Sequence, residues 1–202
     1  RRMKMMFSKF TVLVLRDLTI LCFLLFLPIQ GVRGQNAEDL RWLSTSELQV
    51  SGRLPEDYHG ELGRLPGYLK DQVRLPLWNL GQNAAGMYLE FFTDATTFYI
   101  QYQVLGELAL PHMPATGVSG VDLYAEEESG KWEWLRGQHQ FGEEIQYVYS
   151  GIKPAVEPTL RTYRLYLPLY NTVRNLKIGI SQDANFQQSK SAAELHPILI
   201  YG

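Results

Sequence analysis

The strongest constraint on the fold is a series of short segments in which apolar and polar residues alternate. In Thr97–Leu105 (TFYIQYQVL) the residues at even positions from 98 to 104 are apolar, which is typical of a half-buried strand. No stretch keeps a helical period over three turns. Further strands are predicted at Gly86–Phe92, Val118–Ala125, Lys131–Leu135, Ile145–Tyr149, Thr162–Leu167 and Leu176–Ile180. The sequence therefore predicts an all-β fold, either a β-sandwich or a jelly roll.

Turn residues between these segments predict two hairpins. Thr93–Thr96 joins Gly86–Phe92 to Thr97–Leu105, and the acidic turn Glu126–Gly130 joins the strands on either side of it. Upstream, Arg-Leu-Pro occurs three times between residues 53 and 76. Because the intervening residues do not match, we interpret this region as a proline-punctuated surface loop and not as a repeat.

Composition excludes several classes of protein. The 202 residues carry a net charge of −2, so no basic field predicts nucleic-acid binding. A single cysteine excludes an internal disulfide framework and a cysteine-based zinc site. The four histidines, His59, His112, His139 and His196, form no short-range pair. We therefore expect neither a metal nor a cofactor. The acidic run Glu126–Glu128 is interpreted as a solvated turn in preference to a calcium site.

The first 34 residues differ from the rest of the chain. They hold six basic residues and one acidic residue, and Leu18–Ile29 is an apolar run broken only by Thr19 and Pro28. A membrane-spanning helix needs about 20 apolar residues, so this run is short for a span. Residues 1–34 are therefore predicted to be a secretory signal-peptide helix cleaved near Gly34, with a retained membrane anchor as the alternative. The expected location is the periplasm or exterior of a bacterium.

The last residues also break the pattern. A polar linker precedes Ile198–Ile200, a continuous apolar run of the kind found in strands buried on both faces. We predict three parts: the signal peptide at 1–34, a β-sandwich domain at 35–190, and a linker with the first strand of an α/β domain at 191–202. The rest of that α/β domain is expected to be missing.

Four segments together resemble the N-terminal β-sandwich domain of bacterial SGNH (GDSL-like) hydrolases. They are Val73–Leu80, Pro111–Ala125 (PHMPATGVSGVDLYA), Tyr166–Ile180 (YLPLYNTVRNLKIGI) and Pro197–Gly202 (PILIYG). The resemblance covers roughly residues 40 to 202. It implies that Gly202 is the glycine of a Gly-x-Ser turn whose nucleophilic serine lies two residues beyond the chain. It also implies that the full-length protein is an ester hydrolase with a Ser–His–Asp mechanism, acting on acylated carbohydrates or similar esters.

The residues present do not suggest a catalytic site of their own. A Ser119–His112–Asp122 triad can be written, but no glycine elbow presents Ser119. Strand alternation also points Ser119 and Asp122 to opposite faces. No catalytic residue is therefore predicted, and the chain alone is expected to be inactive. His112 is kept as a candidate substrate-binding residue because it lies in the best-matched segment.

Trp132 and Trp134 share one face of their predicted strand, beside Tyr124 on the neighbouring strand. Either the rings fill the sandwich core, which we favour, or they form an exposed platform for sugar rings. Basic and aromatic residues also alternate within Arg161–Arg174. Without a positive domain, we interpret that segment as a strand with snorkelling arginines and not as a nucleic-acid face.

The expected function is that of a non-catalytic N-terminal accessory module of an exported SGNH-type hydrolase. The module would shape the substrate site of its own C-terminal SGNH catalytic domain, or position substrate there. The alternative is a free-standing carbohydrate-binding β-sandwich module, and a third interpretation is a structural surface protein. The expected partners are the catalytic domain and carbohydrate, without nucleic acid and without a stable membrane anchor.

Overall fold

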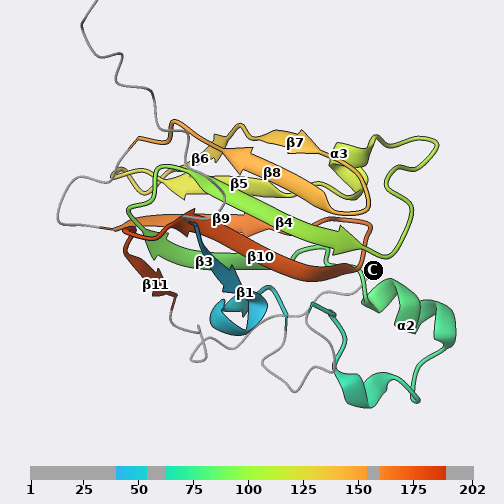
Figure 1. The fold of residues 1–202 in the computed structure, drawn as a ribbon. Coiled ribbons are helices and arrows are strands. Elements are labelled where there is room, and N and C mark those ends of the chain that lie inside the picture. Colours follow the sequence, from blue (N-terminus) through green and yellow to red (C-terminus); the bar gives the residue numbers. More distant parts are fainter. Residues whose placement is uncertain (1–39, 54–61, 154–159, 190–202) are drawn as a thin grey trace, which may run out of the picture. The chain divides into compact units, whose positions relative to one another are not determined.

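The computed structural model describes residues 40–53, 62–153 and 160–189 (Figure 1). All described residues belong to one compact unit, Asn36–Gly202. The predicted signal peptide and the predicted strand at Ile198–Ile200 lie outside the described residues. Within the described ranges, no helix is long and apolar enough to cross a membrane.

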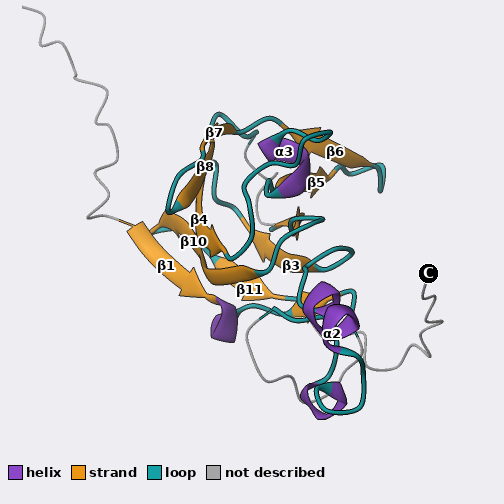
Figure 2. Cartoon of the chain, turned by 90° about the vertical axis from the view of Figure 1, so that its right-hand side faces the viewer, coloured by secondary structure: helices purple, strands orange, loops and turns teal. Residues whose placement is uncertain are grey.

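Two antiparallel sheets face each other as two layers (Figures 1 and 2). We call them the β4 sheet and the β5 sheet. The β4 sheet has the order β1 (Leu40–Ser44), β10 (Val173–Ser181), β4 (Phe98–Val104), β8 (Ile145–Tyr149) and β7 (Gln138–Gln140). The β5 sheet has the order β11 (Phe186–Gln188), β3 (Tyr88–Thr93), β9 (Arg161–Tyr166), β5 (Asp122–Glu126) and β6 (Trp132–Leu135), with β2 (Val50–Ser51) also paired to β3. The all-β sandwich prediction is confirmed.

Helical elements in the described ranges are short. They are η2 (Thr45–Glu47), η3 (Gly67–Leu69), α2 (Leu75–Gly81) and α3 (Ala115–Val118). The proline-punctuated region therefore contains helix, where a loop was predicted. Pro76 stands in the first turn of α2, where its missing N–H has no helical partner to lose.

The core lies between the two sheets and follows from the alternation of residues along each strand. On β4, Phe98, Ile100 and Tyr102 are buried and face β3 and β9 across the sandwich. The Phe98 ring lies 5.8 Å from the Phe91 ring of β3 and 4.8 Å from the Tyr163 ring of β9. These aromatic contacts join the layers without any disulfide.

The first predicted hairpin is wrong. β3 pairs with β9, β2 and β11, whereas β4 pairs with β10 and β8, so the two strands lie in different sheets. Thr93 turns the chain between the layers, since its Oγ1 accepts a hydrogen bond from the Ala95 N–H and donates one to the Asn185 carbonyl. The crossing lets Phe91 and Phe98 pack edge to face across the core, which a hairpin within one sheet would prevent.

The predicted strand Val118–Ala125 is shorter than expected, because Ala115–Val118 is helical and pairing begins at Asp122. The second predicted hairpin is confirmed, with β5 paired to β6 around the acidic turn. The strands predicted near β8, β9 and β10 are also present.

Candidate functional site

A cleft of about 510 Å³ opens on the outer face of the β5 sheet. Its walls come from α3, the start of β5, β6, β9 and the chain that follows β9. The lining residues are Gly86, Thr116, Gly117, Gly120, Asp122, Tyr124, Trp132, Arg164, Tyr166, Leu167 and Leu169. The cleft therefore gathers residues from four parts of the sequence around one strand.

The segment Gly120–Tyr124 supplies both the floor of the cleft and part of the core. Val121 and Leu123 are buried between the sheets, while Asp122 and Tyr124 face outward. Gly120 has no room for a side chain, because an added Cβ would clash with the Thr116 carbonyl oxygen and lie 2.7 Å from the Tyr147 hydroxyl. Val121 and Leu123 therefore pack in the core, whereas Asp122 and Tyr124 line the cleft.

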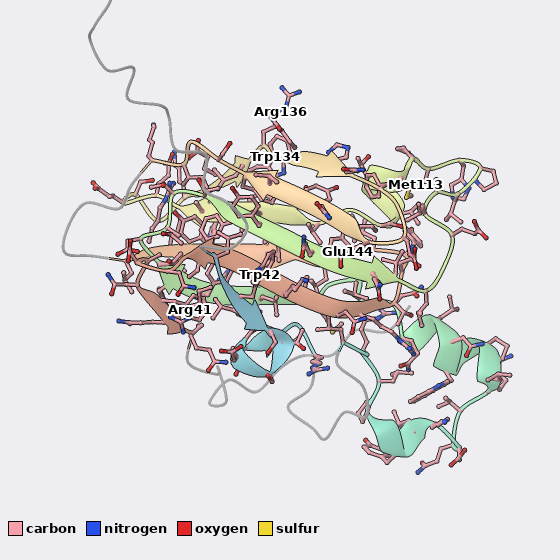
Figure 3. All side chains as sticks on the ribbon, in the orientation of Figure 1. Arg41, Trp42, Met113, Trp134, Arg136 and Glu144 are labelled. Atoms are coloured by element: carbon pink, nitrogen blue, oxygen red, sulfur yellow. The ribbon has the colours of Figure 1, made fainter. Side chains whose placement is uncertain are left out.

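Two tryptophans of β6 lie on the same outer face. Trp134 pairs with Tyr124 across the β5–β6 ladder, and its side chain is 53% exposed. Its Nε1–H donates to an Asp122 carboxylate oxygen at 2.9 Å, which fixes the indole beside the cleft. Figure 3 shows Trp134 on the edge strand β6 and Arg136 just after the end of that strand. Trp132 is half-buried and lines the cleft directly.

Arg164 connects these rings to the centre of the sheet. Its guanidinium carbon lies 4.2 Å from the centre of the Trp132 ring and 5.1 Å from that of Tyr88. Its Nε–H donates to Glu90 on β3 at 2.6 Å. Burial alone would lower the pKa of Arg164, but the hydrogen bond and charge of Glu90 outweigh it and raise the pKa. The guanidinium therefore stays charged and is held in place.

Two further tyrosines, Tyr88 and Tyr166, lie beside these rings on the same face of the sheet. The Tyr166 ring lies 5.3 Å from Tyr88 on β3 and 5.6 Å from Tyr124 on β5. Together, Tyr88, Tyr124, Trp132, Trp134 and Tyr166 place rings on four neighbouring strands, and we call this set the aromatic wall. It combines apolar ring faces with the hydrogen-bonding groups of Asp122 and Arg164.

Buried tyrosine hydroxyls of the β4 sheet donate hydrogen bonds to the backbone that forms the floor of the cleft. The hydroxyl of Tyr102 donates to the Ser119 carbonyl at 2.6 Å, and that of Tyr149 donates to the Val121 carbonyl at 3.2 Å. Ser119 Oγ donates to the Leu108 carbonyl and accepts from Asn171 Nδ2 at 2.7 Å. The chain entering β5 is therefore fixed by hydrogen bonds on its core side, which preorganises the residues on the cleft side.

A family model described as GxDLY, the N-terminus of an SGNH-hydrolase-type esterase, matches residues 40–186. The chain belongs to this family. The five letters of the family name correspond to Gly120–Tyr124, the segment that forms the cleft floor. The predicted family resemblance is therefore confirmed. No curated protein matches the chain significantly.

Solved structures with the same fold are longer than the matched region. A GDSL-like lipase from Bacteroides ovatus ATCC 8483 matches with a TM-score of 0.66 and 23% identity, over 75% of this chain and 43% of the lipase chain. The salicylyl-acyltransferase SsfX3 from a tetracycline biosynthetic pathway matches with a TM-score of 0.56 and 15% identity, over 78% of this chain and 44% of its own. This chain therefore spans less than half the length of each.

In this GxDLY domain, the predicted platform residues Tyr124, Trp132 and Trp134 come together on the outer face. The interpretation that both tryptophans fill the core is wrong, because the inner face of β5 is already occupied by Leu123 and Ala125. His112 is exposed and does not line the cleft. The structure thus gathers three of the four predicted binding residues.

Ser119 and Asp122, two members of the conceivable triad with His112, lie in different environments of the GxDLY domain, one buried and the other at the surface. Ser119 is fully buried, and its hydroxyl is bonded to Leu108 and Asn171. Asp122 instead accepts from the Trp134 indole at the surface. These contacts give Ser119 a structural role.

Other charged groups considered from the sequence form ion pairs or lie in turns. Arg161 pairs with Glu133 at 3.3 Å, as Arg164 does with Glu90, so two arginines of the basic–aromatic segment are already neutralised. Glu127 caps the β5–β6 turn through its contact with Ser129. Within the described ranges, no three His, Cys, Asp or Glu side chains are grouped as metal ligands would be.

Sequence reasoning missed Arg164 and Tyr166 as cleft residues, and it missed Tyr88, whose ring packs against both of them. The Tyr-Arg alternation of β9 was noticed, but its partners on β3 and β6 are far away in sequence. Only the strand order β3-β9-β5-β6 brings Tyr88 and Trp132 to opposite sides of Arg164.

The buried tyrosines predict a steep loss of stability at alkaline pH. Burial raises the pKa of Tyr147 to about 12, and it raises the pKa of Tyr102 and Tyr149 further. Above pH 10 the unfolded chain loses phenolic protons that the folded domain retains, so each tyrosine should lower the free energy of unfolding by about 1.4 kcal/mol per pH unit. Urea unfolding at pH 9, 10.5 and 11.5 measures this slope.

The variant Tyr102→Phe provides the internal control for this slope. It should be less stable at pH 8, because the Ser119 carbonyl loses its donor. Its alkaline slope should nevertheless be shallower, because one titrating phenol is gone. Equal stability at pH 9 and 11.5 in the unmodified chain would contradict the assignment.

Proposed function

We propose that this domain is the N-terminal accessory module of an SGNH-type esterase and that its cleft binds the carbohydrate part of the ester substrate. Membership of the GxDLY family supports the first part, since that family is the N-terminus of such esterases. The aromatic wall supports the second part. It is the observation that carries the proposal.

Sugar rings match the chemistry of this cleft. The C–H face of a pyranose is apolar and packs on aromatic rings, while its hydroxyls need hydrogen-bonding partners at the rim. Trp132 and Tyr124 offer ring faces, and Asp122 and Arg164 offer an acceptor and donors beside them. A cleft of about 510 Å³ is within the usual range for small-ligand sites.

The charges of the cleft favour a neutral ligand. Arg164 is already paired with Glu90, and Asp122 adds a further negative charge at the rim. An anionic ligand would have to compete with Glu90 for the guanidinium and would lie near Asp122. A neutral sugar avoids both costs, because hydroxyls can hydrogen-bond to these groups while the ion pair stays intact.

Calorimetric titration of the chain with two sets of oligosaccharides tests this proposal. One set is neutral (cello-, manno- and xylohexaose), and the other is anionic (oligogalacturonates of similar length). We expect at least one neutral oligosaccharide to bind at least tenfold more tightly than any anionic one. Tighter binding of the uronates, or no binding in either set, would contradict the assignment of the cleft.

The accessory role predicts that residues 1–202 alone hydrolyse p-nitrophenyl acetate at the background rate. Ser119, the serine of the only triad considered, is buried and hydrogen-bonded, so it offers no nucleophile to the ester. We propose that the nucleophile belongs to a hydrolase domain in the same polypeptide. The full-length protein should therefore show serine-dependent turnover. Turnover by residues 1–202 that is abolished in Ser119→Ala would contradict the accessory role.

We also propose that the protein is exported, on the basis of the basic start and short apolar run of residues 1–34. An exported location would bring the cleft to polymeric carbohydrate outside the cytoplasm. The competing interpretation, a carbohydrate-binding module without a hydrolase domain, shares the cleft. The serine-dependent turnover of the full-length protein separates the two.

A further inference from the structure

Exposed apolar side chains are concentrated at one end of the sandwich. Among the described residues, all the large apolar side chains that are exposed, except Trp134, come from three segments. They are Tyr68, Leu75, Leu77, Leu80, Leu105, Leu169 and Tyr170. We call this set the apolar end. Exposed apolar groups that gather in this way mark interaction sites more often than scattered single residues do.

The three segments are tied to one another by backbone hydrogen bonds. Just after α2, the Ala84 N–H donates to the Asn171 carbonyl at 3.0 Å. At the end of β4, the Leu105 N–H donates to the Thr172 carbonyl at 3.1 Å. Figure 1 shows α2 toward the end of the sandwich where β4 ends, and Figure 2 shows α2 nearer to β3 than to β4 and β10. The apolar end is therefore one region of the fold.

Helix α2 presents its leucines outward and not toward the core. Leu75 is 68% exposed and Leu80 is 60% exposed, whereas the only buried residue of the helix is Gly81. Gly81 packs so closely on Leu65 that a Cβ there would lie 2.6 Å from the Leu65 Cγ. A helix of seven residues has little stability by itself. Such a helix is usually stabilised by packing its apolar side chains against the core.

Arg64 holds this helix in place instead. Its side chain donates to the carbonyls of Leu80 and Asn83 at 2.9 and 2.8 Å, at the C-terminal end of the helix. The Leu80 carbonyl also accepts from the Asn83 N–H, and a cation at the C-terminal end of a helix interacts favourably with the helix dipole. The fold therefore maintains α2 in a position where its leucines remain available to a partner.

We propose that the apolar end is the docking surface for the hydrolase domain of the same polypeptide. This inference rests on the part of the proposed function that places such a domain there. The two solved structures that share the fold each have more than half of their chain outside the matched region. A domain linked covalently to this one is always present at high effective concentration, so a moderate apolar surface is enough to hold it.

The composition of the apolar end fits a protein partner better than a sugar. Leucine side chains offer no hydrogen bonds, and Lys70, Asp71 and Arg74 provide a mixed-charge polar rim. Leu169 belongs both to the apolar end and to the lining of the cleft. A domain docked on the apolar end would therefore border the cleft, and a sugar held by the aromatic wall would lie close to it.

Hydrogen exchange of the segment 75–81, measured by mass spectrometry, tests this proposal. We expect exchange in the full-length protein to be at least tenfold slower than in residues 1–202 alone. The triple variant Leu75→Ser, Leu77→Ser and Leu80→Ser should remove interdomain coupling, so that two separate thermal transitions replace one in the full-length protein. The matched control Lys70→Ser, Asp71→Ser and Gln72→Ser changes only polar side chains near the patch and should keep the single transition.

Equal exchange in the two proteins would overturn the proposal. So would protection in residues 1–202 alone that disappears on dilution, because the occupant would then be a second copy of the chain. A full-length protein without a hydrolase domain would overturn this proposal together with the accessory role. If the domain is present but 75–81 is unprotected, only the docking surface fails, and the glycan titrations remain an independent test of the cleft.

Discussion

Replacing Gly120 by alanine should strongly destabilise the domain. The new methyl group would clash with the Thr116 carbonyl oxygen and lie 2.7 Å from the buried Tyr147 hydroxyl. One contact is backbone and the other belongs to a ring fixed in the core, so neither can move without disturbing its neighbours. Overpacking of this kind costs about 1–3 kcal/mol and sometimes more, and we expect about 3 kcal/mol here. Thermal unfolding should show a decrease of roughly 6–12 °C in the melting temperature.

A matched control for this substitution is Gly142→Ala. A Cβ on Gly142 would meet only the Glu144 carbonyl oxygen, at an ordinary contact distance of 3.7 Å. The melting temperature should therefore stay within about 2 °C of the unmodified protein. If the two variants had the same melting temperature, crowding at Gly120 could not be the reason for a glycine at that position.

Local alternation was enough to predict most of the strands but not how they are joined. The pattern of Phe98, Ile100 and Tyr102 predicted β4 and its buried face correctly. The turn residues after β3 fit a hairpin and a crossing between layers equally well. The difference comes from Phe91 and Phe98, whose contact across the core is a tertiary interaction without a local signal.

Other elements were missed for identifiable reasons. All residues of β7 are exposed and polar, so only its pairing with β8 makes Gln138–Gln140 a strand. Helix α2 is too short for a helical period to appear. A signal was present, however, since Leu-Pro in the third Arg-Leu-Pro copy places Pro76 in a first helical turn.

The candidate site was predicted in part. Two-residue spacing correctly placed Trp132 and Trp134 on one face beside Tyr124. It could not show which face is exposed, because Leu123 and Ala125 make the opposite face of β5 apolar as well. Arg164 could not be placed beside Trp132 without knowing that β9 and β6 flank β5.

Replacing Trp132 by alanine should weaken the proposed carbohydrate binding at least tenfold while the domain stays folded. The indole lines the cleft and lies over Arg164 at 4.2 Å, so its loss removes a ring face and also frees the guanidinium. Aromatic residues at the centre of binding sites contribute about 2 kcal/mol or more, which corresponds to roughly 30-fold in affinity. Because Trp132 is only half-buried, the melting temperature should fall by just a few degrees.

Trp42 offers a closely matched control on the other sheet. It is also half-buried on an outer strand and also lies against a cation, with Lys177 Nζ 4.8 Å from its ring centre. Trp42→Ala therefore removes an indole and a cation–π contact of the same kind, far from the cleft lining. If the loss of a surface tryptophan has a general effect on melting temperature or affinity, that effect should be equal in Trp132→Ala and Trp42→Ala.

The most direct test of the proposed carbohydrate site is a calorimetric titration of the unmodified chain, Trp132→Ala and Trp42→Ala with the neutral oligosaccharide that binds best. We predict at least tenfold weaker binding for Trp132→Ala and an affinity within twofold of the unmodified chain for Trp42→Ala. Binding by Trp132→Ala at the unmodified affinity, or an equal loss in both variants, would contradict the assignment of the cleft as the carbohydrate site.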